Sequence, residues 1–348
     1  MKKLTSLLLT LVIIVCLLTS CNNDSTDSDT AQTSDNLTSN TTATHSETIQ
    51  PNPESDFEYK VRDEGGIEIT KYLGTSEDVV IPENINGLSV SYIGGIFYPN
   101  ESKTIGAFQN SNIKSVVTPS SLKHIYNNAF SDCKNLSLVT FLPNSEVTLI
   151  SAAFQNCTSL EKIDLSVTKI TKIGPLSFSG CTNLKEITFS DDLLEIGTEA
   201  FYNCASIEKI ELPNTIEKID TKAFANCLSL KSVNVPTKLK LMNIDGSRFY
   251  NVPNLEKIIF DDGWQNIQGY GFFSITSTVN IIIPQNVANI DLITFDNSGH
   301  INIIFSGNCP QLSGTDYVSG PVPIYYDPDT NGWDDCTWKN DFTLIPIE

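Results

Sequence analysis

The cysteines are the residues whose spacing most constrains their chemistry. The chain has 9 cysteines, and five of them recur every 23 or 24 residues, namely Cys133, Cys157, Cys181, Cys204 and Cys227. A disulfide framework favours paired cysteines at irregular spacing, and a metal site needs a histidine or a second cysteine within a few residues. We therefore predict that the five thiols share one internal repeat position, where they act as small apolar fillers.

Two further cysteines, Cys309 and Cys336, lie outside this series near the C-terminus. An oxidising exterior would permit a disulfide between them. The sequence leaves the bridged and the free forms equally open.

The three histidines, His45, His124 and His300, offer little for acid–base catalysis. Their neighbours form no recognisable nucleophile or acid motif, and the sequence has no glycine-rich phosphate loop. We predict surface histidines, no catalytic residue and no cofactor. A hydrolase that uses the acidic surface is the least favoured alternative.

One segment matches half of a calcium loop. Asp327, Asp329, Asn331 and Gly332 occupy the first, third, fifth and sixth places of an EF-hand-type loop, but the twelfth place, which needs a bidentate Glu, is Trp338. Asp334 or Asp335 could substitute as a ligand. Tyr325-Tyr326 before this segment and Gly332-Trp333 after its start look like a closing hairpin. We favour a turn in a hydrophobic cap, and we predict no metal.

The N-terminus has the pattern of a secretion signal. Lys2 and Lys3 precede an uncharged apolar run over residues 4–18, which is short for a transmembrane helix. The run ends in Leu18-Thr19-Ser20-Cys21, which resembles the lipobox of bacterial lipoproteins. The resemblance implies a signal peptide over residues 1–20 and a diacylated Cys21 that holds the chain to the extracellular face of a bacterial membrane. An ordinary signal peptide with a chance cysteine is the competing interpretation.

Residues 22–55 consist almost entirely of Asn, Asp, Ser, Thr and Gln, with six acidic residues and no Lys or Arg. Such a segment has too little apolar surface to fold. As a flexible coil it would span about 30 Å. We predict that residues 21–55 form a lipidated, disordered tether.

A repeat begins after this tether. From Phe97 onward the sequence shows a small residue followed by Phe, often a Cys three residues later, and then a Leu-x-x-Ile-x-Leu pattern. The repeated Phe positions are 22 to 25 residues apart: 108, 130, 154, 178, 201, 224, 249, 273 and 295. The alternating apolar residues predict short strands with one buried face, separated by turns. A fixed period of this length indicates a solenoid in which each unit is one coil.

The repeat resembles the unit of the BspA-like leucine-rich-repeat family, I-P-x-x-[IV]-x-x-I-G-x-x-A-F-x-x-C-x-x-L-x-x-[IV]. The segment from Ile196 to Ile207, IGTEAFYNCASI, follows it closely, and the opening from Gly66 to Gly74 looks like the family's N-terminal coil. We expect a β-rich leucine-rich-repeat solenoid, a stack of about nine to ten coils with short parallel strands. Capping coils are expected over 56–107, the solenoid over 108–305 and a C-terminal cap over 306–348.

Charge narrows the class of partner. The net charge is −19, and loss of Lys2 and Lys3 with the signal peptide makes the mature chain more acidic still. Binding to nucleic acid requires a basic face, so nucleic acid is excluded as a partner. An acidic surface keeps an extracellular protein soluble.

The outward side chains of neighbouring coils should form ladders across the sheet. One ladder alternates in sign, Glu161, Lys185, Glu208, Lys231 and Glu256, and the next reads Lys162, Glu186, Lys209, Ser232 and Lys257. Opposite charges on adjacent strands stabilise each other, so these rows satisfy themselves. The row beyond them mixes chemistries and is the candidate binding surface: Thr140, Asp164, Thr188, Glu211, Asn234 and Ile259.

The leading hypothesis is adhesion to, or recognition of, an unknown protein or glycan through this sheet. The resemblance implies surface adhesion and host-protein binding for some family members only. The main alternative is a structural role in the cell envelope without a specific host ligand.

Overall fold

The computed structural model describes residues 50–126, 128–240, 247–268, 277–295, 301–314 and 322–347. These residues belong to the second of two compact units, Ile49–Glu348, the first being Met1–Thr48. The expected signal peptide, Cys21 and most of the tether lie outside the described ranges, as do His45, Phe273 and His300. None of the helices within these ranges is long and apolar enough to cross a membrane.

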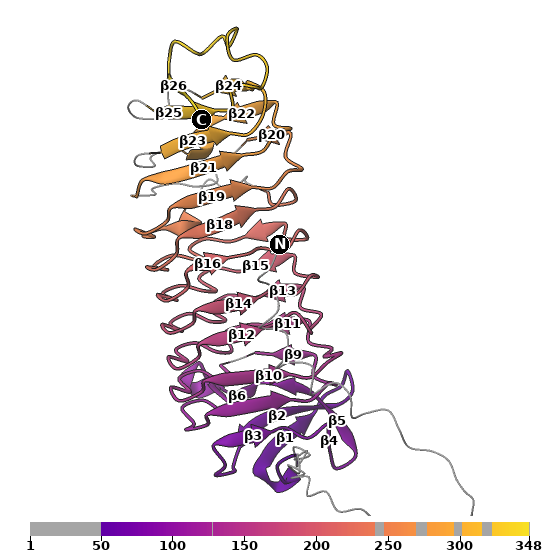
Figure 1. Ribbon diagram of the computed structural model, residues 1–348. Coiled ribbons are helices and arrows are strands. Elements are labelled where there is room, and N and C mark those ends of the chain that lie inside the picture. Colours follow the sequence, from indigo (N-terminus) through magenta and orange to yellow (C-terminus); the bar gives the residue numbers. More distant parts are fainter. Residues whose placement is uncertain are drawn as a thin grey trace, which may run out of the picture. The chain divides into compact units, whose positions relative to one another are not determined.

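The second unit is a β-solenoid of about 11 turns, which confirms the predicted fold. One side of the stack is a mainly parallel sheet in which short strands from successive coils lie side by side (Figure 1). Its order is β1 (Phe57–Val61), β2 (Ile67–Tyr72), β5 (Leu88–Ile93), β9 (His124–Ile125), β11 (Leu149–Ile150), β13 (Lys172–Ile173), β15 (Glu195–Ile196) and β17 (Lys218–Ile219). The strands β1 and β4 (Asn84–Ile85) pair antiparallel with β2 and β5, respectively. Farther along the stack, this side carries β20 (Asn266–Ile267), β22 (Asn289–Asp291) and β24 (Gln311–Ser313).

The opposite side carries a second set of strands, and we call its solvent-facing surface the outer face. These strands form three parallel groups. The first is β3 (Asp78–Val80), β8 (Ser115–Thr118) and β10 (Leu138–Phe141), and the second is β12 (Lys162–Asp164) and β14 (Glu186–Thr188). The third contains β16 (Lys209–Ile210), β18 (Ser232–Val235), β19 (Lys257–Phe260), β21 (Val279–Ile283), β23 (Ile301–Phe305), β25 (Pro323–Tyr326) and β26 (Thr343–Pro346).

The described residues also contain four 3-10 turns: Glu54–Asp56, Pro99–Glu101, Ser247–Phe249 and Leu292–Phe295.

A column of phenylalanines fills the space between the two sides. Consecutive rings from Phe108 to Phe249 stack with centroids 4.7 to 5.5 Å apart and planes within 15° of parallel. The repeated Leu and Ile residues of both sides pack around this column and are almost fully buried. Each coil therefore buries its Phe against its two neighbours, as the period predicts.

The chain turns sharply two residues after each Phe in this column. The residue at that position has a left-handed backbone with φ between 54° and 77°, in the series Asn110, Asp132, Asn156, Gly180, Asn203, Asn226 and Asn251. Asn, Asp and Gly adopt this conformation more readily than other residues. Some of these side chains also link the coils, since the Asn156 amide donates to the Asp132 carboxylate (3.1 Å).

The ends of the stack differ from the sequence-based boundaries. Asn52 exchanges two hydrogen bonds with Val80, each 2.8 Å, so the folded unit begins before the predicted tether end at residue 55. At the other end, β25 and β26 pair in parallel and continue the solenoid into the predicted cap. The expected closing hairpin there is wrong because Tyr325 and Tyr326 form a further rung.

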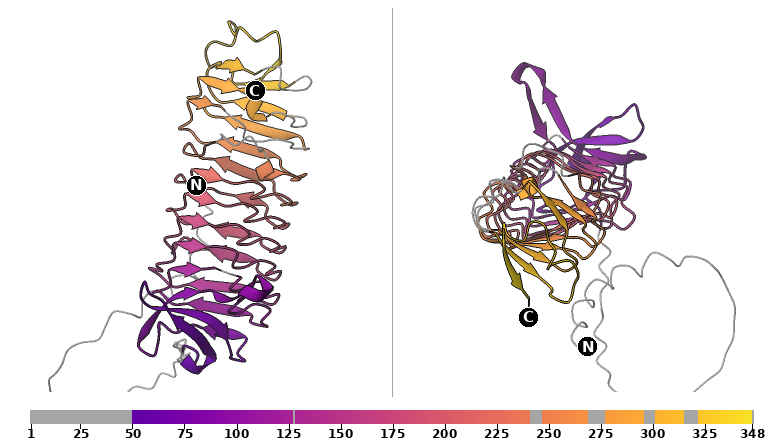
Figure 2. Two further views of the ribbon diagram at one scale, coloured as in Figure 1. Left: turned by 180° about the vertical axis from the view of Figure 1, so that it is seen from behind. Right: turned by 90° about the horizontal axis from the view of Figure 1, so that it is seen from above.

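An antiparallel hairpin of β6 (Gly95–Tyr98) and β7 (Lys103–Gly106) projects from the N-terminal coils (Figure 2). Phe97, where the sequence suggested that the repeat signature begins, lies on this hairpin and is 60% exposed. The first phenylalanine of the stacked column is therefore Phe108.

Candidate interaction surface

The five repeated thiols are internal and share one role. Each is fully buried and lies where its S–H can donate to the carbonyl of a phenylalanine one coil earlier, as from Cys181 to Phe154 (3.1 Å) and from Cys204 to Phe178 (3.2 Å). Burial raises the pKa of Cys181 to about 12, which keeps the thiol protonated. The cysteines therefore tie adjacent coils together, which adds a directional contact to the predicted filling role. They are unsuited to nucleophilic chemistry.

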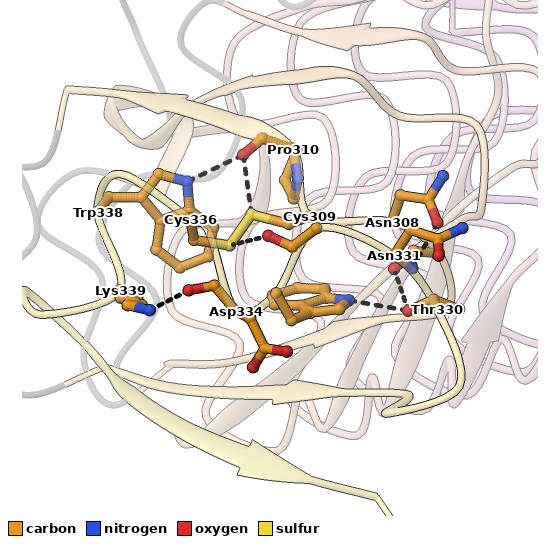
Figure 3. Close-up of a disulfide and its surroundings, with 12 residues drawn as sticks. Asn308, Cys309, Pro310, Thr330, Asn331, Asp334, Cys336, Trp338 and Lys339 are labelled. Carbon is orange, nitrogen blue, oxygen red and sulfur yellow. Dashed lines mark hydrogen bonds between the residues drawn. A yellow bond between two sulfur atoms is a disulfide. The ribbon is translucent and has the colours of Figure 1, made fainter.

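Cys309 and Cys336 form a disulfide between the last turns of the stack, with their Cα atoms 6.5 Å apart (Figure 3). Trp338 lies beside it, and its indole N–H donates to the carbonyl of Pro310 (2.9 Å). The Trp333 indole N–H donates to Thr330 Oγ1 (2.8 Å). Both tryptophans are only 5% exposed, so this region is a packed cap.

The half-matched calcium loop is a turn within that cap. Asp327 Oδ1 accepts the backbone N–H of Asp329 (2.9 Å), and the Asp327 carbonyl accepts from the Thr330 hydroxyl (2.6 Å). The backbone N–H of Asn331 donates to Asn308 Oδ1 on the previous coil (2.9 Å). These bonds hold the turn through its backbone and through the side chains of Asp327, Thr330 and Asn308. In the described ranges, His, Cys, Asp and Glu side chains do not gather in a group that could hold a metal ion.

His124 lies on β9 in a cluster that the sequence did not indicate. Its ring contacts Tyr92 (centroids 5.4 Å apart) and Tyr126 (6.4 Å). Burial lowers the pKa of His124, and the charges of Lys123 and Arg62 lower it further. His124 is therefore a packed neutral residue in this cluster.

The same cluster contains a fully buried carboxylate, Glu68. Glu68 Oε2 accepts from Lys60 (3.0 Å), Arg62 (2.9 Å) and the Tyr126 hydroxyl (2.8 Å). Burial, followed by the hydrogen bond to Glu68, raises the pKa of Tyr126. The alternation of Ile67, Glu68 and Ile69 predicts an exposed Glu68, and its cover comes from Lys60 on β1, from Arg62 and from Tyr126, which follows β9 and lies 58 residues away.

Three ion pairs within the charged rows of the outer face form as predicted, while Lys209 of the second row pairs outside it. Lys185 contacts Glu161 (3.0 Å) and Lys231 contacts Glu208 (2.7 Å) in the first row. In the second row, Lys162 contacts Glu186 (3.3 Å). These pairs are exposed, so each contributes little to stability, but they leave few free charges there for a ligand.

The predicted binding row is less available than the sequence suggested. Glu211 forms an ion pair with Lys209 of the same segment. The Asp164 carboxylate accepts the backbone N–H and hydroxyl of Ser166 (3.0 and 2.6 Å). Asn234 bonds both the N–H and the carbonyl of Leu212 (2.6 and 3.0 Å). Thr140 is half-buried and Thr188 is exposed. Three of the six row members therefore already have partners within the chain.

Ile259 begins a different surface. Register places it beside Asn234 on one side and Ile282 on the other, and the row continues through Ile304, Tyr325 and Ile345. These residues alternate with buried neighbours along β19, β21, β23 and β25, so they face outward, and all five are partly exposed. We call the five residues Ile259, Ile282, Ile304, Tyr325 and Ile345 the apolar ladder.

Two open hollows flank Ile259. One, of about 660 Å³, lies toward Thr237 and Lys238, and the other, of about 410 Å³, lies toward Ile282 and Pro284. Ile259, Phe260 and Asp262 line both hollows. Asp261 lines the larger one, and burial raises the pKa of this carboxyl group. The ladder therefore begins at an uneven surface with apolar and acidic walls.

Sequence reasoning stopped at Ile259 because alignment on the phenylalanines becomes irregular beyond Phe249. The sequence pattern that could have identified the rest of the ladder lies within the strands. The segments Val279–Ile283 and Ile301–Phe305 carry Ile at a position that alternation assigns to solvent.

The chain shares its repeat with known proteins. The model of the BspA type leucine rich repeat region, in 6 copies, matches residues 103–209 and 194–315. A search of curated proteins gives no match.

Solved structures give partial likenesses. A Treponema pallidum leucine-rich-repeat protein is 28% identical, with 61% of this chain and 86% of that chain covered and a TM-score of 0.42. A Bacteroides ovatus leucine-rich-repeat protein is 19% identical, with coverages of 78% and 70% and a TM-score of 0.43. A leucine-rich cell surface protein from Faecalibacterium prausnitzii is 19% identical, with coverages of 87% and 95% and a TM-score of 0.30. Since the family match spans more than half of the sequence, the chain belongs to the BspA-type leucine-rich-repeat family.

Proposed function

We propose that this protein is a lipid-anchored, extracellular binding protein that recognises a protein or glycan through the outer face of its solenoid and catalyses no reaction. The observation that carries the proposal is the apolar ladder. Its outward residues cross successive strands, and they do not pair with one another as the charged rows do. A partner on this row would contact several coils at once, which suits a stacked parallel sheet. Family membership supports a binding role.

The anchor is supported by the lipobox-like residues before Cys21 and by the apolar run that precedes them. Two or three acyl chains hold a protein durably to a membrane. Cys21→Ser should block acylation and either release the chain from the membrane fraction or leave it unprocessed. Labelling of cells with a radioactive fatty acid checks this, and equal labelling of wild type and variant would contradict the anchor.

The binding role is tested by immobilising the mature chain, purified in detergent, and measuring saturable binding to a panel of matrix proteins and glycans. Retention without turnover of the bound molecule supports recognition. Absence of saturable binding across the panel would favour the structural role in the envelope.

The site is tested by pairs of substitutions on the outer face. Ile282→Thr with Ile304→Thr should weaken binding by tenfold or more, since they change partly exposed side chains that face solvent. The matched control, Lys185→Ala with Lys231→Ala, removes two self-paired charges and should leave binding nearly unchanged. The opposite order of effects would place the binding site elsewhere on the chain.

A further inference from the structure

The apolar ladder is an outward surface that the chain leaves incompletely covered. Its five residues lie on five adjacent parallel strands in strict register. Contiguous exposed apolar residues on a soluble protein mark sites of interaction. The polar row upstream differs, because Asp164, Glu211 and Asn234 bond to other groups of the chain.

Charge around the ladder selects the kind of partner. Residues 247–348 contain 12 acidic and 3 basic residues, a net charge of −9. Asp261 and Asp262 directly follow β19, and Asp327 and Asp329 follow β25, so acidic side chains lie at the carboxyl ends of ladder strands. A second copy of this acidic chain would be repelled, whereas a basic partner would be attracted. A row of isoleucines also suits an apolar polypeptide surface better than a sugar.

The spacing of the ladder selects the partner's conformation. Adjacent strands lie about 4.8 Å apart, so four intervals span about 19 Å. One helical turn rises 5.4 Å, so four turns span about 22 Å. Side chains on one face of an extended strand repeat at about 6.7 Å, which falls out of step with the ladder after one interval. A helix running along the stack can therefore place about one apolar side chain over each rung.

We propose that the apolar ladder binds a basic amphipathic helix of about four turns presented by a partner protein. This inference rests on the proposed function and names the class of partner. The apolar stripe of the helix covers Ile282, Ile304 and Tyr325, and one of its larger side chains enters a hollow beside Ile259. Its Lys or Arg residues face the aspartates that follow β19 and β25.

A designed peptide pair provides the probe. The first is an 18-residue Leu/Lys peptide with Leu at i, i+3, i+4 and i+7, which forms an amphipathic helix. The second has the same composition in an order that removes the apolar stripe. We expect the mature chain to bind the amphipathic peptide at least tenfold more tightly than the scrambled one in fluorescence anisotropy at physiological salt. Equal affinity for the two peptides would mean attraction by charge alone and would overturn the proposal.

Variants then locate the site. Ile282→Thr with Ile304→Thr keeps β-branched side chains in the strands and should remove the preference for the amphipathic peptide. The control Val117→Thr makes the same change at an outward position on β8, outside the ladder, and should preserve the preference. Circular dichroism and thermal unfolding verify that both variants fold. A preference that survives the double substitution would place the peptide elsewhere and overturn the proposal.

The binding panel separates this inference from the proposed function. If a matrix protein or glycan binds the Ile282→Thr, Ile304→Thr variant as well as it binds wild type, the ladder is refuted while a binding role stands. If the panel ligand loses affinity with this variant but the amphipathic peptide shows no preference, the ladder is the site and the helix is the wrong occupant.

Discussion

Phe178→Ala tests whether the phenylalanine column holds the solenoid together. Phe178 is fully buried and stacks between Phe154 and Phe201, with centroids 5.3 and 5.2 Å away. Removing its ring opens a cavity between the preceding coil and the following coil. The packed coils on either side limit how far the structure can collapse into this cavity. The expected effect is therefore larger than that of losing one methyl group or one exposed contact.

The magnitude follows from these contacts. Truncation of a buried Phe to Ala typically costs about 3–5 kcal/mol. Each stacked aromatic pair adds roughly 0.5–1.5 kcal/mol beyond area burial, and Phe178 has two. We expect the free energy of unfolding to fall by about 5 kcal/mol, at the upper end of the range for a single cavity.

The control is Cys181 in the same coil. Cys181→Ala removes a small side chain and its thiol bond to the Phe154 carbonyl, which keeps the N–H of Cys157 as a donor (3.3 Å), so it should cost about 0.5–1.5 kcal/mol. Cys181→Ser retains a donor and should cost less. Urea unfolding followed by far-UV circular dichroism gives the three values, with hydrogen exchange of the flanking coils as a local check. If Phe178→Ala and Cys181→Ala cost the same, the column is not the principal tie between coils.

Three further predictions address local features. Lowering the pH from 7.5 to 5 should reduce the melting temperature, because burial lowers the pKa of His124 below the 6.5 of a free imidazole and protonation then favours the unfolded chain; His124→Gln should diminish this loss, and an identical pH profile would contradict it. Ala152→Asn should stabilise the protein by about 0.5–1 kcal/mol in urea unfolding, because Ala152 has φ 48° and Asn tolerates this region better, as Asn128 does one coil earlier; a loss of stability would refute the argument. Replacing Cys309 and Cys336 together by Ser should destabilise the cap by about 3–4 kcal/mol, the chain-entropy value for a closed loop of this length, and reductant should then no longer alter the melting temperature.

The repeat made most of the solenoid predictable. Leu160, Ile163 and Leu165 recur with their equivalents in every regular coil, so one coil defines the buried positions of the next. The same repetition predicted the exposed ion pairs, because register between coils follows directly from the period. In such a fold, the residues that contact each other across coils are those that occupy equivalent positions in the repeat, so the local sequence pattern also predicts the long-range contacts.

Departures from the repeat were not predictable in the same way. The hairpin that contains Phe97 is an insertion between coils, and its Phe imitates the core signal. Glu68 occupies an alternating position that suggests exposure, and only contacts with Arg62 and Tyr126 reveal that it is buried. The hydrogen bonds of the thiols could not be predicted from the sequence, because Cys serves equally as an apolar filler and as a weak hydrogen-bond donor.

The outer face has two ways of satisfying its side chains, and the contrast bears on function. Between β12 and β18, Lys and Glu on neighbouring strands neutralise each other, and Asn234 bonds to the backbone beside it. From β19 onward, apolar residues replace the polar side chains of the row that contains Asn234, and an outward isoleucine can be satisfied only by apolar contact. Neighbouring rungs supply part of that contact, which explains why each ladder residue is half-buried, but they cannot cover the surface above the ladder. A partner with an apolar face would complete the coverage, which is why we place the proposed binding site on the C-terminal half of the outer face.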